Sequence, residues 1–113
     1  MDRGPYFQTS RERRKQIVTS GIVWAPSARS DLARIDLYYS ELDLEFANRT
    51  ARNAVAAAKF LQANPHAGPK IDGTAYRKWH VPETPFLLIY RPEKGTIRVL
   101  RVRHAREDWQ SNG

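Results

Sequence analysis

The side chains that could carry out chemistry gather near the C-terminal end of the sequence, at Arg101, Arg103 and His104. An arginine can stabilise the charge that develops on a phosphate during cleavage, and a histidine can transfer a proton. With Arg77, they are the residues that an endoribonuclease would use, because such an enzyme must activate a 2′-hydroxyl, hold the phosphate and protonate the leaving oxygen. Tyr90 could also carry a proton, but its place after an apolar run indicates a core aromatic.

The alternation of side chains along the last strand decides whether these residues can act together. A strand over Ile97–Arg103 would turn its odd-numbered residues to one face and its even-numbered residues to the other. Arg101 and Arg103 would then lie opposite His104, unless a bulge at the end of the strand changed the alternation. This split favours a basic binding surface over a nuclease site. It also favours a structural role for His104, closing the last strand onto Trp109.

Neither a metal site nor a cofactor site is predicted. The three histidines are far apart and show no metal-ligand spacing, and without cysteine the chain can form neither a disulfide nor a thiolate site. No apolar run approaches the roughly 20 residues of a membrane span, and the N-terminus lacks the apolar section of a signal peptide. We therefore predict a soluble cytoplasmic protein that does not act at a membrane.

The net charge of +7 is concentrated in the C-terminal part of the chain. Residues 70–106 hold nine lysines and arginines against three acidic residues, whereas residues 21–69 hold five of each. A positive surface of this kind attracts nucleic acid, the ribosome or an acidic protein segment. The alternative is a charge that serves only solubility, which the concentration in one region disfavours.

The first half of the chain is predicted to form a strand and a helical hairpin. Residues 21–24 are mainly β-branched and aromatic, and Pro26 suits the first turn of a helix. Apolar residues then recur at steps of four and three in two stripes, which indicate two amphipathic helices joined near Glu41–Asp43. Asp31 and Arg34 fall on the polar face of the first helix. The first stripe is Ala28, Leu32, Ile35, Tyr39 and Leu42, and the second is Ala47, Ala51, Ala54, Ala58 and Leu61.

From Thr74 onward the pattern becomes that of strands. Residues 75–81, 86–90 and 97–103 are rich in β-forming residues and are separated by turns with proline or glycine, so we predict an antiparallel meander. The expected order is β-α-α-β-β-β in a single α+β domain over residues 21–113. Residues 1–20 show no apolar periodicity, and we interpret them as a basic N-terminal extension that is flexible or non-native.

Four segments of this sequence together resemble the ParE/RelE superfamily of toxins from type II toxin–antitoxin modules. They are the strand-to-helix entry at residues 23–32 (VWAPSARSDL), the helix end at residues 64–68 (NPHAG), the strand at residues 85–91 (PFLLIYR) and the ending at residues 99–109 (VLRVRHAREDW). The ending is similar to that of the ParE branch. The resemblance covers about residues 21–109.

The resemblance implies a helical hairpin packed on a twisted antiparallel sheet. It also implies a cognate antitoxin, a small acidic protein with a DNA-binding N-terminus, in a hetero-oligomer with the toxin. ParE-type relatives inhibit DNA gyrase, and RelE-type relatives are endoribonucleases that cut messenger RNA in the ribosome. Fold alone does not choose between these activities. We favour a ParE-type toxin that acts by binding. The alternatives are a ribosome-dependent endoribonuclease and an inactive superfamily member that only binds its antitoxin.

Two sets of contact residues follow from this reading. The target would be contacted by the basic ending of the chain and its aromatic residue, namely Arg101, Arg103, Arg106 and Trp109. An amphipathic antitoxin helix would cover large apolar side chains that lie off the helical stripes, because a small domain seldom leaves so many exposed. Acidic antitoxin residues would meet nearby cations. The antitoxin set is Leu37, Tyr38, Phe46, Val55, Phe60 and Arg77.

Overall fold

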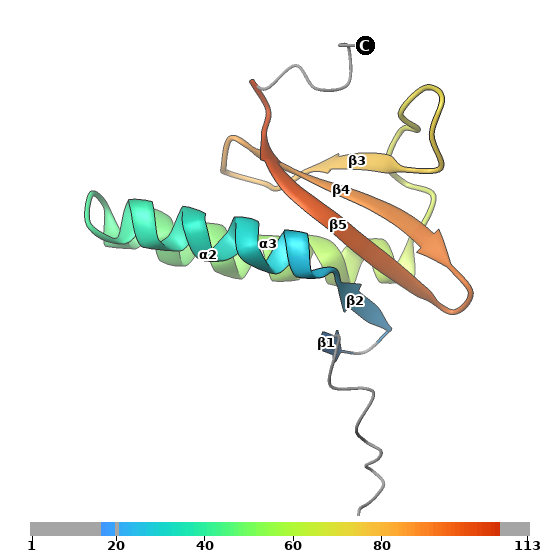
Figure 1. Ribbon diagram of the computed structural model, residues 1–113, viewed down its shortest axis with the longest axis horizontal. Coiled ribbons are helices and arrows are strands. Elements are labelled where there is room, and N and C mark those ends of the chain that lie inside the picture. The colour runs from blue at the N-terminus through green and yellow to red at the C-terminus, as the bar shows by residue number, and fades with distance from the viewer. Residues whose placement is uncertain (1–16, 20, 107–113) are drawn as a thin grey trace, which may run out of the picture.

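The computed structural model describes residues 17–19 and 21–106, which form a helical hairpin packed against a five-stranded sheet (Figure 1). The strand order is β1-β2-β5-β4-β3, in which β2 and β5 are parallel and all other neighbours are antiparallel. Among the described residues, no helix has the length and apolar character to cross a membrane. The elements are β1 (Ile17–Thr19), β2 (Ile22–Trp24), α2 (Pro26–Ser40), α3 (Leu44–Ala63), β3 (Arg77–His80), β4 (Phe86–Glu93) and β5 (Thr96–His104).

The predicted α+β fold is confirmed, with one strand more than expected. The sheet is mixed rather than wholly antiparallel, because β2 runs parallel to β5. Strand β1 pairs with β2 in antiparallel register, beginning with Ile17 opposite Trp24. The turn between them passes through Gly21, whose φ of 83° is a conformation that favours glycine. β1 lies within the stretch 1–20 that we interpreted as an extension, so the sheet begins earlier than predicted. Three residues are too few to show a periodicity. Residues 1–16 lie outside the described part of the chain.

The helical hairpin is joined between Ser40 and Leu44, where the connection was predicted. Pro26 occupies the first turn of α2. Asp43 caps α3, because its carboxylate accepts a hydrogen bond from the backbone N–H of Phe46 at 3.0 Å. Leu42, which we had placed on the first apolar stripe, lies beyond the end of α2 and is exposed.

The core lies between the hairpin and one face of the sheet. Small side chains on α3 let that helix approach the strands closely. Ala51 of the predicted stripe is exposed, and Ala57 is buried instead, so the buried face of α3 is slightly rotated from the predicted one. The main buried contributors are Ala54, Ala57, Ala58 and Leu61 from α3, and Leu88, Tyr90, Ile97, Val99 and Val102 from the sheet.

A bulge interrupts the pairing of β4 with β5. Ile89 lies opposite Arg101, and Tyr90 lies opposite Val99, so Leu100 is an extra residue without a partner across the strands. A bulge of this kind shifts the alternation of side chains by one position. The residues of β5 before and after Leu100 therefore do not follow a single odd–even rule.

The bulge determines which side chains of β5 face the helices. Residues that lie opposite one another on neighbouring strands point to the same side of the sheet. His104 pairs with Phe86, which belongs to the core, so Arg101 and Arg103 point to the other side. The arginines are thus separated from His104, as the sequence indicated. The expectation that Val99 shares a face with Arg101 was wrong.

Candidate functional site

The candidate site forms where helix α2 runs along the edge of β5. β2 pairs with β5 only as far as Val99, which leaves the later part of that edge without a strand. The chain then hydrogen-bonds to β5 as it enters α2. The N–H of Ala25 donates to the carbonyl of Val99 at 2.9 Å, and Oγ of Ser27 donates to the carbonyl of Leu100 at 2.7 Å. Beyond the last residue pair of β2 and β5, the edge of β5 is therefore hydrogen-bonded by the start of α2.

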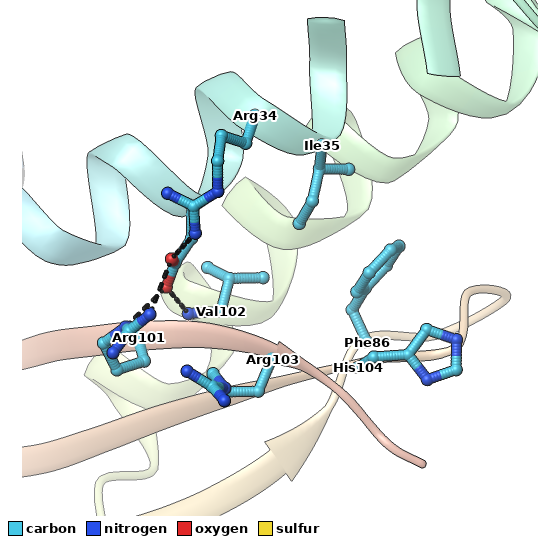
Figure 2. A pocket seen from close by; sticks show the side chains of 8 residues that line it. Arg34, Ile35, Phe86, Arg101, Val102, Arg103 and His104 are labelled. Carbon is cyan, nitrogen blue, oxygen red and sulfur yellow. Dashed lines mark hydrogen bonds and ion pairs between the residues drawn. The ribbon is translucent and has the colours of Figure 1, made fainter. Parts of the chain in front are cut away.

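Asp31 completes this arrangement from the middle of α2. Its side chain is 3% exposed, and its Oδ2 accepts the backbone N–H of Val102 at 2.9 Å. Arg101 forms a bidentate ion pair with it, donating through Nε at 2.8 Å and through Nη2 at 2.9 Å. Arg34 donates through Nη2 to Oδ1 at 2.6 Å. Figure 2 shows Arg34 and Arg101 reaching toward each other from the helix and the strand.

The environment of Asp31 keeps it ionised. Burial alone would raise the pKa of this carboxyl group, because it disfavours the charged form. The hydrogen bonds from Arg101, Val102 and Arg34 together outweigh burial and hold the pKa below its ordinary value of 3.8. Asp31 is therefore an anion near neutral pH and does not exchange protons there. The Arg34 side chain remains 66% exposed, so a positive charge faces solvent beside it.

A hollow of about 170 Å³ opens beside this cluster, and we call it the cationic hollow. Its lining brings together three arginines and a histidine, together with Ile35 and Phe86. It lies at the edge of β5 that faces α2, so side chains from both faces of the strand reach it. An anion such as a carboxylate or a phosphate suits such a lining. The charged and titratable members besides Asp31 are Arg34, Arg101, Arg103 and His104.

His104 is held by structural contacts in this hollow. Its Nδ1 accepts the backbone N–H of Arg106 at 3.0 Å, and its ring packs edge-on against Phe86 with centroids 5.5 Å apart. Arg106 is exposed. Trp109, onto which we expected His104 to close, lies outside the described residues. Among the described residues, no three His, Asp or Glu side chains form a group that could hold a metal ion.

Arg77 does not line the cationic hollow. It lies on β3, where its Nη1 donates to the carbonyl of Gly68 at 2.8 Å and anchors the loop that follows α3. Tyr90 holds the same loop, because its hydroxyl accepts the N–H of Gly68 at 3.0 Å and donates to the carbonyl of Pro65 at 2.9 Å. Burial raises the pKa of Tyr90, so its hydroxyl stays protonated. Tyr90 is a core aromatic, as the sequence indicated, whereas the structural use of Arg77 was not predicted.

The residues that we assigned to the antitoxin lie in more than one place. Leu37 and Tyr38 are 70% and 62% exposed, near the tip of the hairpin, which projects beyond the sheet (Figure 1). Val55 lines a furrow between α2 and α3. These three side chains are available to a partner. They are not part of the surface that contains Phe60.

Phe60 and Phe46 have different surroundings. Phe60 stacks on Trp79 of β3, with ring centroids 5.2 Å apart, and remains 44% exposed. Phe46 packs against Tyr39 and Phe86 at the rim of the core and is half-buried. Within the described part of the chain, the residues assigned to the antitoxin therefore do not line one common pocket.

Asp31 and Arg34 are the site residues that the sequence reasoning missed. Both fall on the polar face of the first helix, and the sequence assigned them no role. A carboxylate and a guanidinium three positions apart on a helix are close enough to pair, and that spacing was the available signal. What the spacing does not reveal is that β5 supplies three further hydrogen bonds to Asp31, two from Arg101 and one from Val102.

Comparisons with known proteins agree with this fold. The family model described as "ParE toxin of type II toxin-antitoxin system, parDE" matches residues 22–109. A solved structure described as "Chromosomal ParDE TA system from P. aeruginosa" is similar, with a TM-score of 0.63 and 28% sequence identity. That similarity covers 72% of this chain and 90% of the other. No curated protein matches the sequence.

Proposed function

The chain belongs to the ParE toxin family of type II toxin–antitoxin systems, and on this basis we propose that it inhibits DNA gyrase. It acts by binding the target rather than by a reaction of its own, in the cytoplasm. A cognate antitoxin neutralises it. The finer parts of this proposal rest on the chemistry of the cationic hollow and on the exposed apolar side chains of the hairpin.

The cationic hollow is the observation that carries the proposal. Arg34, Arg101 and Arg103 surround it with positive charge. Asp31 stays an anion because hydrogen bonds from Arg101, Val102 and Arg34 lower its pKa. His104 accepts a backbone N–H through Nδ1. Among the described residues, the arginines of the hollow can bind an anion. Asp31 and His104, which could transfer protons in a cleavage reaction, are instead engaged in hydrogen bonds within the fold. This favours contact with an acidic or phosphate-bearing surface over cleavage.

A supercoiling assay with purified full-length chain tests the proposal. We expect inhibition of gyrase supercoiling, with accumulation of cleaved DNA. The variant Arg103→Glu should need at least about tenfold more protein, because it reverses a charge in the hollow. Lys59→Glu, on the exposed side of α3, is the matched control and should act like the wild type. Full gyrase activity at concentrations that arrest growth would exclude gyrase as the target.

Messenger RNA cleavage in the ribosome is the second candidate. One observation favours it: Arg101, Arg103 and His104 line the same hollow even though the strand separates them. A cell-free translation reaction with mapped 5′ ends of the message would detect this activity. If cleavage occurs and His104→Ala abolishes it while supercoiling stays intact, the chain is an endoribonuclease. If expression without antitoxin causes no growth defect, the chain is an inactive member that only binds its antitoxin.

The antitoxin that we propose is a small acidic protein with a DNA-binding N-terminus, which forms a hetero-oligomer with this chain. Four large apolar side chains support a partner of this kind, because each is between 43% and 70% exposed and a monomer seldom leaves so many uncovered. They are Leu37, Tyr38, Val55 and Phe60. Acidic residues of the antitoxin would meet the cations of β3 and β5.

A further inference from the structure

A second hollow, apart from the cationic one, lies between helix α3 and the turn that joins β3 to β4. Its volume is about 360 Å³, which is at the lower end of the roughly 300–1,000 Å³ of small-ligand sites and suits one inserted side chain. The lining combines the small residues Ala56 and Ala57 with an aromatic pair, Pro82 and one carboxylate. We call it the α3–turn groove.

Phe60 and Trp79 are the aromatic pair of this groove. Their rings stack at an interplanar angle of 21° and a centroid distance of 5.2 Å. Phe60 is 44% exposed, although the core is close by. The faces of aromatic rings attract cations, tryptophan most strongly. They also cover the alkyl stem of a lysine or arginine, whose charged end stays near polar groups.

Glu83 is the carboxylate of the groove, and its backbone is unusual. Its φ is 63°, and among the described residues it is the one non-glycine residue with a positive φ. Such a conformation costs free energy for any residue with a Cβ atom. The turn is fixed around it, because Thr84 Oγ1 donates to the carbonyl of Val81 at 2.9 Å and Asn53 Nδ2 donates to the carbonyl of Pro82 at 2.9 Å.

The Glu83 side chain has no use within the described fold. It is exposed, and no lysine or arginine of the described residues forms an ion pair with it. Glycine would adopt this backbone without strain. Glu83 adopts a strained backbone conformation in a fixed turn beside a hollow, and strained residues of this kind often serve binding.

We propose that the α3–turn groove receives one lysine or arginine side chain of the antitoxin. The alkyl stem lies against Phe60 and Trp79, and the charged end pairs with Glu83. The chain has a net charge of +7, but Glu83 makes this groove locally negative. A basic side chain of an otherwise acidic partner can therefore bind here. Nucleic acid does not fit, since it carries no cation. The proposal rests on neutralisation by an antitoxin, as proposed above.

A titration with n-butylguanidinium chloride tests the groove without the antitoxin. We expect the indole N–H resonance of Trp79 and the amide resonance of Glu83 to shift and saturate at millimolar concentrations in the ¹⁵N-labelled full-length chain. Sodium butyrate should cause no saturating shift, because it carries the opposite charge. The absence of a saturating shift would overturn the proposal. An equal response to 1-butanol would also overturn it, since the groove would then be merely apolar.

Three variants test the link to the antitoxin. Glu83→Gly should raise the midpoint of thermal unfolding, because it removes the strained conformation, and yet weaken binding of the antitoxin about tenfold. Glu83→Gln should weaken binding without that rise. Glu45→Gln, an exposed glutamate at the start of α3, is the control and should do neither.

The outcomes separate this proposal from the proposed function. If the wild type binds the antitoxin and both Glu83 variants bind equally well, the anchor is wrong and neutralisation stands. If the wild type binds no antitoxin, the proposed neutralisation fails, and the n-butylguanidinium titration still decides whether the groove takes a cation. A concentration-dependent dimer that Glu83→Gln abolishes would assign the groove to a second copy of this chain and overturn the antitoxin as its occupant.

Discussion

Asp31 accepts the backbone N–H of Val102 at 2.9 Å, across 71 positions of sequence. The same carboxylate forms the bidentate ion pair with Arg101. One side chain therefore closes the open edge of β5 and sets the charge of the cationic hollow. Stability of the sheet and electrostatics of the site are coupled at this residue.

Replacement of Asp31 should destabilise the fold strongly. Asp31→Ala leaves the buried N–H of Val102 without an acceptor and removes the carboxylate that binds Arg101, so we expect a loss of about 3 kcal/mol in the free energy of unfolding. Urea denaturation followed by circular dichroism measures it. Asp36→Ala, an exposed aspartate on the same helix, should change stability by less than about 0.5 kcal/mol. Equal effects of the two variants would contradict the role of Asp31.

The contribution of Asp31 should depend on pH in one direction. Its pKa is lower in the folded state than in the unfolded chain, so ionisation stabilises the fold fully above the ordinary value of 3.8. That stabilisation is lost as the pH falls through the lower, folded-state pKa. The difference in unfolding free energy between the wild type and Asp31→Asn should therefore be constant near neutral pH and shrink in acid. A difference that grows as the pH falls would have the wrong sign.

The hydroxyl of Tyr90 should matter for stability rather than for activity. It bonds both Gly68 and Pro65, and no side chain fits at Gly68, where a Cβ atom would lie 2.3 Å from the carbonyl of Lys78. Tyr90→Phe leaves the buried Gly68 N–H without an acceptor and should cost about 2 kcal/mol. Tyr38→Phe, at an exposed tyrosine, should cost nothing measurable. If Tyr90→Phe abolishes toxicity in a chain that stays folded, the hydroxyl has a chemical role.

Glu93 should stabilise the β4–β5 hairpin by forming ion pairs with two arginines that would otherwise repel each other. Arg91 and Arg98 lie directly opposite each other, and Glu93 Oε2 pairs with both, at 2.7 and 3.1 Å. The hydrogen bond from Arg91 is the main cause that lowers the pKa of Glu93. Glu93→Gln should cost about 0.5 kcal/mol, because these groups are partly exposed and screened. Thermal unfolding in low and high salt checks it: the cost should shrink in 1 M salt, and a cost independent of salt would argue against an electrostatic origin.

The exposed apolar residues of the hairpin should contribute to antitoxin affinity. Phe60→Asp and Leu37→Asp each place a charge where an apolar contact is proposed, so we expect the dissociation constant to rise at least about tenfold. Isothermal titration with the cognate antitoxin measures the dissociation constant. Leu42→Asp is the matched control, since Leu42 is also a leucine near the hairpin tip, 65% exposed, and was not assigned to the antitoxin. Unchanged affinity in both test variants would contradict the assignment.

The sequence predicted those parts of the fold that depend on local patterns. The two apolar stripes predicted α2 and α3 because side-chain spacing along a helix is set by its own geometry. Proline, asparagine and glycine marked the connection after α3 and the turn before β5 for the same local reason. The family followed from short segments in order, and the family model confirms it.

The parts that could not be predicted depend on contacts between distant segments. The bulge at Leu100 follows from the register of β4 against β5. Leucine is common in regular strands, so the sequence at this position does not indicate a bulge. Asp31 falls on the polar face of its helix, and its burial depends on contacts with β5. Phe46 lies off the apolar stripe of its helix and is therefore expected at the surface, but Tyr39 and Phe86 pack against it. The apolar periodicity of a helix or strand predicts its buried face. It does not predict which other element packs against that face.

Strand β5 is the last strand along the described chain, and it lies in the middle of the sheet between β2 and β4. Until it has been synthesised, the pair β1–β2 has no connection to the pair β3–β4 within the sheet, and Asp31 has neither Arg101 nor Val102 to bind. Folding on the ribosome therefore cannot finish before the final strand leaves the exit tunnel, since long-range pairing has to wait for its partner. A chain that ends before β5 therefore cannot form the cationic hollow, because Arg101, Arg103 and His104 all lie on that strand.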